Sequence, residues 1–430
     1  MAEISTQIQD KAKERKEDES IFSLGMKIQK EREVYRAYGA GGGGFEEKPT
    51  KGEIVTWYFY GFCTNFVLTV LIPIVFPLLI SQTVPDLPEP PQGWLKSYKG
   101  LKCLQEEMQL YGGLVFREVR VGRTSFSPLE WTSISWITGL LLSAPILGVM
   151  SFSLDHGQSQ QLIAGAATGI GALFCLPAGF FRKSGIFLPY IAAIVAASTV
   201  AGAASSRYLA LLIRGFTGSK LPKSQFAIRR VVASKLSLYS TVAGCFGAII
   251  MASFTYNMLN HSDHFTALWV VSIFSGLLWG LGLINIFGVA RSAGSSADSQ
   301  DDDPAPIAHL FSIFRYPFAA ASLALIFLSS FLIMCVFVGS LLYAFGTVLA
   351  LDCTPAGKEG AFSAWFSWAR ALGTCAGFAL AAAMPGNVGK TFGISLCAAI
   401  VAMVVLIFGN ISSLKGAKTA GHVIKIRKGS

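Results

Sequence analysis

One arginine stands inside an otherwise uncharged apolar stretch, and its type and position single it out as a candidate binding residue. Arg370 lies about ten residues into the apolar run 361–384, after Trp365 and Trp368. A guanidinium at the centre of a bilayer costs about 2.5 to 3.5 kcal/mol on insertion scales, so Arg370 needs a partner. Three kinds of partner are open: backbone carbonyl groups, an interfacial position that the long side chain reaches, or an anionic group on a substrate.

Three uncharged polar residues in other apolar runs are further candidates, namely Asn65, Tyr256 and Asn285. An amide or a phenol at membrane depth can contact a substrate, but it more often forms a hydrogen bond between helices. The candidate substrate-binding residues are therefore Arg370, Asn65, Asn285 and Tyr256, with a structural hydrogen bond as the alternative for each.

The sequence shows no pattern that indicates catalysis or metal binding. It contains no phosphate-binding loop, no G-x-S-x-G, no H-E-x-x-H and no C-x-x-C. Its eight cysteines lie mostly inside apolar runs without a histidine companion, which indicates neither a disulfide framework nor a zinc site. We therefore predict that the chain is not an enzyme, with no catalytic residue, no metal and no cofactor.

The composition indicates a polytopic membrane protein. Of 430 residues, 52% are hydrophobic and only 14% are Asp, Glu, Lys or Arg, against about 25% charged residues in a typical soluble domain. The lipid bilayer is thus the main expected partner. The net charge of +10 comes from loops and tails beside apolar runs, so it indicates membrane topology and not nucleic-acid binding. No pattern indicates an oligomeric state.

About 20 consecutive apolar residues are needed to cross a bilayer as a helix. Nine runs qualify, at approximately 54–80, 131–152, 161–181, 185–204, 236–258, 266–289, 319–349, 361–384 and 391–411. The predicted fold class is therefore an all-α membrane bundle of about nine spans. The run 319–349 is about 31 residues or 46 Å long, which exceeds one span and falls short of two. One span, a re-entrant segment and a junction between two shortened helices all fit it.

The spans and the polar stretches between them divide the chain into five parts. They are an N-terminal tail (1–52), a first group of six spans (53–290), a linker (291–318), a second group of three spans (319–412) and a basic tail (413–430). No apolar segment of a signal peptide follows the first methionine, so we expect the N-terminal tail to be cytosolic.

Loop charges predict the orientation but leave one conflict. The stretch from Ser205 to Lys235 carries seven basic residues and no acidic one, which is typical of a cytoplasmic loop. Four spans separate it from the N-terminal tail, which therefore lies on the same side. The tail 413–430 is also basic, but nine crossings place it on the opposite side. An even number of crossings would remove the conflict.

Two stretches resemble a known family. The residues from Lys51 to Phe62 (KGEIVTWYFYGF) resemble the first helix of the autophagy-related vacuolar effluxer branch of the major facilitator superfamily. The residues from Pro355 to Phe362, with the Trp-rich and Gly-rich helix that follows, look like the loop and eleventh helix of that branch. The resemblance implies two six-helix halves that alternate in access. On that basis the first half is complete and the second is shortened, with about two helices absent around 338–344.

A third stretch resembles the loop motif that follows helix two in this superfamily. Its residues here are Gly148, Asp155 and Gly157. The gap between Gly148 and Asp155 is longer than in the motif, and uncharged residues replace its basic ones. The sequence alone therefore assigns no gating role to these residues.

The resemblance implies a function. It predicts a secondary transporter of a small organic solute, with amino-acid efflux from a vacuole or another endomembrane, rather than the plasma membrane, as the specific form. Arg370 would then anchor a carboxylate. The predicted spans contain no Asp or Glu, which favours facilitated efflux over proton symport. The alternative is a shortened isoform that does not transport and acts as a membrane scaffold or regulatory partner.

Overall fold

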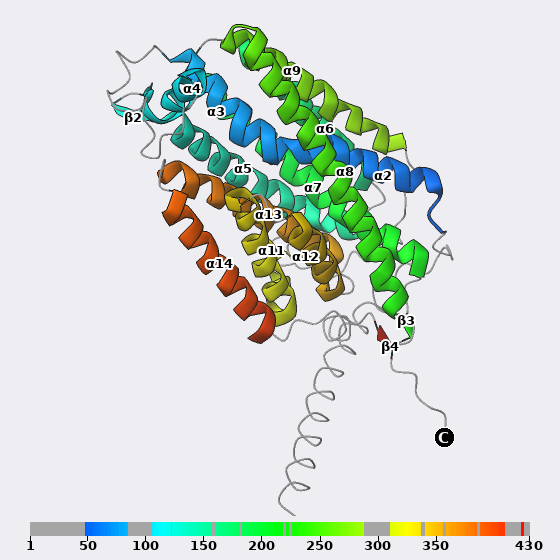
Figure 1. The fold of residues 1–430 in the computed structure, drawn as a ribbon. Helices are drawn as coiled ribbons and strands as arrows, with labels where there is room; N and C mark the ends of the chain where they lie inside the picture. Colours follow the sequence, from blue (N-terminus) through cyan, green and yellow to red (C-terminus); the bar gives the residue numbers. More distant parts are fainter. Residues whose placement is uncertain are drawn as a thin grey trace, which may run out of the picture.

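A computed structural model describes the part of the chain that forms the helical bundle. The described residues are 48–84, 105–121, 123–156, 160–180, 183–217, 221–222, 226–287, 310–336, 340–355, 358–384, 388–408 and 423–424. They form a bundle of long helices, in which the later helices lie along one side of the earlier ones (Figure 1). Of the predicted N-terminal tail the structure describes only residues 48–52, and of the predicted linker only residues 310–318.

All six runs predicted between residues 54 and 289 are helical. In chain order the elements are α2 (Lys51–Phe66), η1 (Val67–Val75), α3 (Phe76–Thr83), α5 (Pro128–His156), α6 (Gln160–Cys175), η2 (Leu176–Gly179), η3 (Ser184–Ile186), α7 (Phe187–Thr217), α8 (Phe226–His261), α9 (His264–Leu281) and η5 (Gly282–Phe287). Thr50 caps the first helix, because its side chain accepts a hydrogen bond from the backbone N–H of Glu53 at 3.3 Å. Its segment η1 is π-helical and contains Pro73, which has no N–H to donate to the regular α-helical ladder.

In the second group, the structure distinguishes between the interpretations that the sequence left open for the run 319–349. The run 319–349 is not one long span but two helices, α11 (Pro317–Val336) and α12 (Ser340–Cys353). A short 3-10 turn, η6 (Ser312–Arg315), precedes them, and α13 (Glu359–Ala383) and α14 (Val388–Phe408) follow.

The helices α11 and α12 form a hairpin that returns to the end from which it starts. Ala319 near the start of α11 and Ala350 near the end of α12 share one apolar cluster with Ala361 at the start of α13. Since α12 has 14 residues, it is about 21 Å long, too short to cross a hydrocarbon core of about 30 Å.

The structure confirms a polytopic helical membrane protein. Among the described residues, seven helices are long and apolar enough to cross a membrane. These helices are Lys51–Thr83, Pro128–Asp155, Gln160–Gly179, Ser184–Phe216, Phe226–His261, His264–Asn285 and Gly389–Ile407. The apolar helix Pro317–Leu332 is shorter. The predicted span 361–384 is the helix α13, which carries Glu359 and Arg370 and is not among the seven.

One end of the bundle, here called the α2 end, gathers the start of α2, the end of α7, the start of α8 and the end of α12. Trp57, Leu212, Ala233 and Leu351 from these four helices belong to one buried cluster. Between α7 and α8 lies the strand β3 (Leu221–Pro222), which pairs in parallel with β4 (Val423–Ile424) from the C-terminal stretch.

This pairing bears on the side of the C-terminal tail, which the sequence left open. Because β4 is joined to β3, Val423 and Ile424 lie at the α2 end (Figure 1). Among the described helices, six crossings, a returning hairpin and the pair α13 and α14 make an even number of passages. The even number removes the conflict that nine crossings created.

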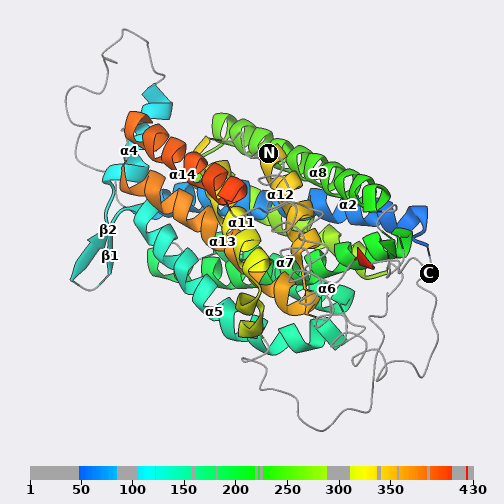
Figure 2. The ribbon, with the colours of Figure 1, turned by 90° about the horizontal axis from the view of Figure 1, so that it is seen from below.

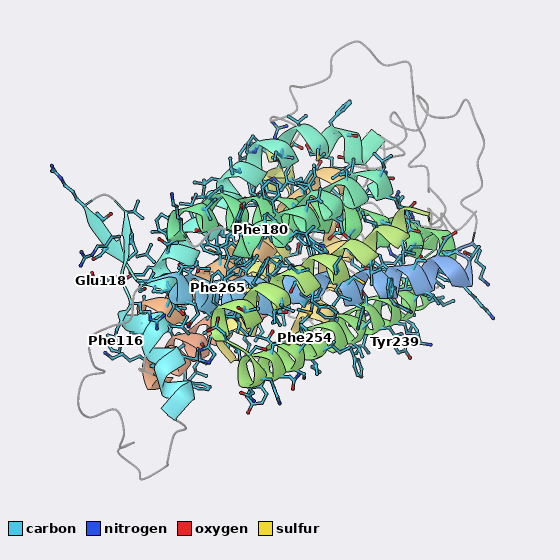
Figure 3. The ribbon with its side chains drawn as sticks, turned by 90° about the horizontal axis from the view of Figure 1, so that it is seen from above. Phe116, Glu118, Phe180, Tyr239, Phe254 and Phe265 are labelled. Atoms are coloured by element: carbon cyan, nitrogen blue, oxygen red, sulfur yellow. The ribbon has the colours of Figure 1, made fainter. Side chains whose placement is uncertain are left out.

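A small extramembrane element separates α3 from α5 at the opposite end of the bundle. It consists of helix α4 (Gln105–Phe116) and the antiparallel strands β1 (Val119–Val121) and β2 (Thr124–Phe126). Figure 3 shows Glu118 in this element, away from the main bundle. Arg117 donates a hydrogen bond to the backbone carbonyl of Ser81 and so ties the element to the end of α3.

Helix α14 lies at the outside of the bundle and packs on α11 (Figures 1 and 2). Its outward side chains, among them Leu396, Ile400 and Met403, are apolar and exposed. In a membrane these side chains contact lipid, which is the expected environment for an apolar peripheral helix.

Candidate functional site

A cavity of about 120 Å³ lies between helices of the two groups. Its walls come from α2, α7, α8 and α9 of the first group and from α12 and α13 of the second. Asn65 on its wall follows Lys51 by 14 residues, which places it about 20 Å along α2. The cavity is therefore inside the bundle, at membrane depth.

The cavity wall is rich in hydroxyl groups. Hydroxyl-bearing residues that line it are Tyr60, Thr64, Ser198, Ser205, Ser206, Ser237, Ser240, Thr241 and Thr347. The aromatic rings of Trp57, Trp279 and Phe366 complete much of the remaining surface. A site with a few polar groups among apolar and aromatic ones is typical of small-molecule binding.

Four of these hydroxyl groups already donate their proton inside the protein. Thr64, Ser198, Ser206 and Thr241 each donate to a carbonyl three or four residues earlier in their own helix, at 2.8 to 3.0 Å. A hydroxyl group has one proton to donate and can still accept. These four oxygens therefore offer acceptor capacity to anything that enters the cavity.

Two of the four predicted binding residues meet on the cavity wall. The guanidinium of Arg370 on α13 donates a hydrogen bond to Oδ1 of Asn65 on α2, at 3.1 Å. The two residues are 305 positions apart in the sequence. The contact joins the two helix groups, and the sequence analysis had named both residues without pairing them.

The other two predicted residues lie outside the cavity wall. Asn285 is in η5, where its side chain is buried and its Oδ1 has no hydrogen-bond partner among the described residues. Tyr256 is 60% exposed on α8. Figure 3 labels Tyr239 and Phe254 on the same helix, at the edge of the bundle. The structure thus separates Asn285 and Tyr256 from the pair Arg370 and Asn65.

Close packing of α13 against the first group fixes the position of Arg370. The hydroxyl of Ser367 donates to the carbonyl of Thr199 on α7 at 2.6 Å, and the indole N–H of Trp368 donates to the carbonyl of Leu140 on α5 at 3.2 Å. A Cβ on Gly202 would lie 2.6 Å from the Oγ of Ser367. Glycine at this position therefore allows α7 and α13 to approach closely.

A buried group of charges connects the two helix groups at the α2 end. Glu359, at the start of α13, forms ion pairs with Arg207 and Arg214 of α7. Arg207 also donates from its Nε to the carbonyl of Leu154 at 3.2 Å. Glu359 and Arg207 are both almost fully buried, so neither charge is screened well by water.

This charge group is not evident from the sequence, because Arg207 and Arg214 fall in the stretch assigned to a cytoplasmic loop. The structure corrects this assignment, since α7 continues to Thr217 and only residues 218–225 separate it from α8. The spacing of the two arginines in the sequence does indicate a shared partner. Residues seven positions apart lie on the same face of a helix, so both could have been expected to meet one acidic partner.

Asp155 makes a second connection between the groups. Its carboxylate accepts hydrogen bonds from the backbone N–H of Gly360 and, at 3.1 Å, of Ala361. These N–H groups belong to the first turn of α13 and have no acceptor within the helix. A negative charge is favourable at this position. Of the other residues of the predicted loop motif, Gly148 has nothing within 4 Å of the position a Cβ would take, and Gly157 lies outside the described residues.

A third connection joins α8 to α12. The Nε of Arg229 lies 3.7 Å from Oδ1 of Asp352, whose side chain is 1% exposed. Burial raises the pKa of Asp352 from 3.8 to about 6, and the nearby Arg229 and Arg230 counteract part of this rise. The α2 end of the bundle is therefore held together by three separate polar contacts between helices of the two groups.

Comparisons with known proteins covered family models, curated proteins and solved structures. No protein-family model matches the sequence, and no curated protein matches it either. Among solved structures, the chain is similar to the crystal structure of the human organic anion transporter MFSD10 (TETRAN), at 15% identity over 86% of this chain and 100% of that one. The TM-score of this match is 0.41.

Proposed function

We propose that the chain is a secondary transporter, which moves a small organic solute across a membrane by alternating access between its two helix groups. The observation that carries the proposal is the hydroxyl-lined cavity at membrane depth, because both helix groups build its wall. A site at the interface of two bundles becomes accessible from either side when one bundle rocks against the other.

The three polar contacts at the α2 end support this mechanism. Opening the cavity toward that end requires the pairs of Glu359 with Arg207 and Arg214 to separate, and the same holds for Asp155 with the start of α13. Each of these contacts joins one helix group to the other. They therefore stabilise the state in which the α2 end is closed, and their loss accompanies the opposite state.

The more specific form of the proposal is amino-acid efflux from a vacuole or another endomembrane. Its support is the resemblance of residues 51–62 and 355–362 to the vacuolar effluxer branch, together with Arg370 as a group that can hold a carboxylate. The orientation in this form is cytosolic for the N-terminal tail, and hence for the α2 end.

Transport by the full chain in liposomes tests the proposal. Uptake and counterflow of labelled amino acids, sugars and organic acids should exceed the values of protein-free vesicles for at least one solute. Ser205→Phe places a ring in the cavity wall and should lower that uptake at least about tenfold, since a filled site cannot bind solute. Gly393→Phe is the matched control, because it adds the same ring where nothing lies within 4 Å of the glycine.

A non-transporting membrane scaffold is the second candidate. The short helix α12 favours it, because 14 residues do not complete a crossing of the second group. Folded wild-type protein in liposomes that moves no solute of the panel above the protein-free background would contradict the transport proposal and favour the scaffold.

A further inference from the structure

We propose that the solute carries a carboxylate, which binds the guanidinium of Arg370 in place of the amide oxygen of Asn65. This inference rests on the proposed transport function and specifies the chemistry of the same cavity. It also assigns the contact between Arg370 and Asn65 a role, as a link between the two helix groups that solute binding releases.

The charge of the cavity wall favours an anion. Arg370 brings one positive charge, and none of the described residues that line the cavity is Asp or Glu. A carboxylate is attracted to this charge more strongly than in water, because the surroundings have a low dielectric constant. The planar guanidinium can also bind both oxygens of a carboxylate at once.

The amide oxygen of Asn65 already occupies an acceptor position on the guanidinium, at 3.1 Å. It is a neutral acceptor, whereas a carboxylate forms a charge-assisted hydrogen bond that is roughly twice as strong. A carboxylate can therefore displace it. Since Asn65 belongs to α2 and Arg370 to α13, displacement removes one polar contact between the groups. Binding is then coupled to their relative position.

The hydroxyl groups of the wall indicate what else the solute carries. Thr64, Ser198, Ser206 and Thr241 have donated their protons within their own helices and can only accept. A solute with a hydrogen-bond donor beside its carboxylate satisfies them, and both a 2-hydroxy acid and a 2-amino acid have such a donor. A volume of about 120 Å³ is close to that of a cavity of about 150 Å³ that binds benzene, and so it suits a small solute.

Four probes of one shape separate these requirements. Valine has a carboxylate and an amine, and 2-hydroxy-3-methylbutanoate has a carboxylate and a hydroxyl. By contrast, 3-methylbutanoate lacks the donor and valinamide lacks the carboxylate. Binding is measured as the rise in the thermal unfolding midpoint of the detergent-purified full chain, since a ligand of the folded state raises it. Transport of each probe is measured separately in liposomes.

We expect valine or its hydroxy analogue to bind best, 3-methylbutanoate to bind more weakly, and valinamide not to bind. Arg370→Gln removes the positive charge, and Asn65→Asp supplies a permanent carboxylate of nearly unchanged shape. Each should weaken carboxylate binding at least about tenfold. Arg315→Gln is the matched control, because it removes a guanidinium from an exposed position outside the cavity, and it should bind as the wild type does.

Different outcomes overturn the inference and the proposed function. Valinamide binding as tightly as valine, or carboxylate binding that survives both Arg370→Gln and Asn65→Asp, overturns the inference. If valinamide or a sugar is nevertheless transported, the proposed transport function stands and only the carboxylate inference is overturned. Carboxylate binding that depends on Arg370, without uptake in liposomes, supports the inference and contradicts transport. If no solute binds and none is taken up, both the inference and the proposed function are overturned.

Discussion

At the scale of single residues, Glu359 is the point where two arginines of another helix converge. Its carboxylate is buried and pairs with Arg207 and Arg214. Removing one partner of a buried ion pair leaves the other charge uncompensated, at a cost of about 3 to 5 kcal/mol. We expect Glu359→Gln to lower the free energy of unfolding by this order, measured by denaturation of the detergent-purified protein.

An exposed pair provides the control for Glu359. Glu118 lies 4.0 Å from Arg120, and both side chains are more than half exposed. Solvent-exposed pairs stabilise proteins by at most about 1 kcal/mol, so Glu118→Gln should leave the unfolding transition in place. Equal stability of Glu359→Gln and Glu118→Gln would show that the buried charges do not connect α13 to α7.

The sequence reveals some of these residues and hides others for a physical reason. Arg370 is visible because a charge inside an apolar run is costly wherever it lies, so composition alone marks it. Glu359 precedes its run and looks like an ordinary loop residue. Its partner Arg207 is 152 positions away, and nothing in a single sequence gives the distance between two residues so far apart.

At the scale of elements, α13 carries both Arg370 and Glu359, so its packing decides the geometry of the cavity and of the α2 end. Gly202→Ala places a Cβ 2.6 Å from the Oγ of Ser367. Either this hydroxyl rotates away and loses its hydrogen bond to the carbonyl of Thr199, or α7 and α13 move apart. Overpacking of this kind costs about 1 to 3 kcal/mol. We expect a lower thermal unfolding midpoint and weaker binding of any solute that contacts Arg370.

The matched substitution is Gly393→Ala on the peripheral helix α14. Nothing lies within 4 Å of the position its Cβ would take, and alanine favours a helix over glycine by about 1 kcal/mol. This variant should be as stable as the wild type or more so. If Gly202→Ala behaves in the same way, α7 and α13 are not in the close contact described here.

Element prediction from the sequence succeeded where apolar runs ended in polar stretches. The six spans of the first group are of this kind. It failed at α11 and α12, because no charged residue and no proline stands between Ser329 and Leu351, so hydropathy gives one continuous run. The hairpin is instead defined by packing, with Ala319 and Ala350 in the same cluster. Such contacts are set by tertiary structure and not by local pattern.

At the scale of the whole molecule, the cavity and the polar contacts at the α2 end share the same two helices. Arg370 and Glu359 are both on α13. Arg207 is on α7, which also forms part of the cavity wall. A movement of α13 relative to α7 therefore changes the solute site and the closed end together. This shared dependence is what alternating access requires of a carrier.

The topology of the chain follows from the pairing of β3 with β4, and it gives the last prediction. Because Val423 and Ile424 pair with Leu221 and Pro222, β4 lies at the same end of the bundle as the start of α2. A reporter fused after Ser430 and one fused before Met1 should therefore give the same protease accessibility in sealed vesicles. A reporter placed between α4 and β1 should give the opposite result, because that element lies at the other end of the bundle.

Opposite accessibility of the two terminal reporters would mean an odd number of crossings. It would contradict both the returning hairpin of α11 and α12 and the strand pairing.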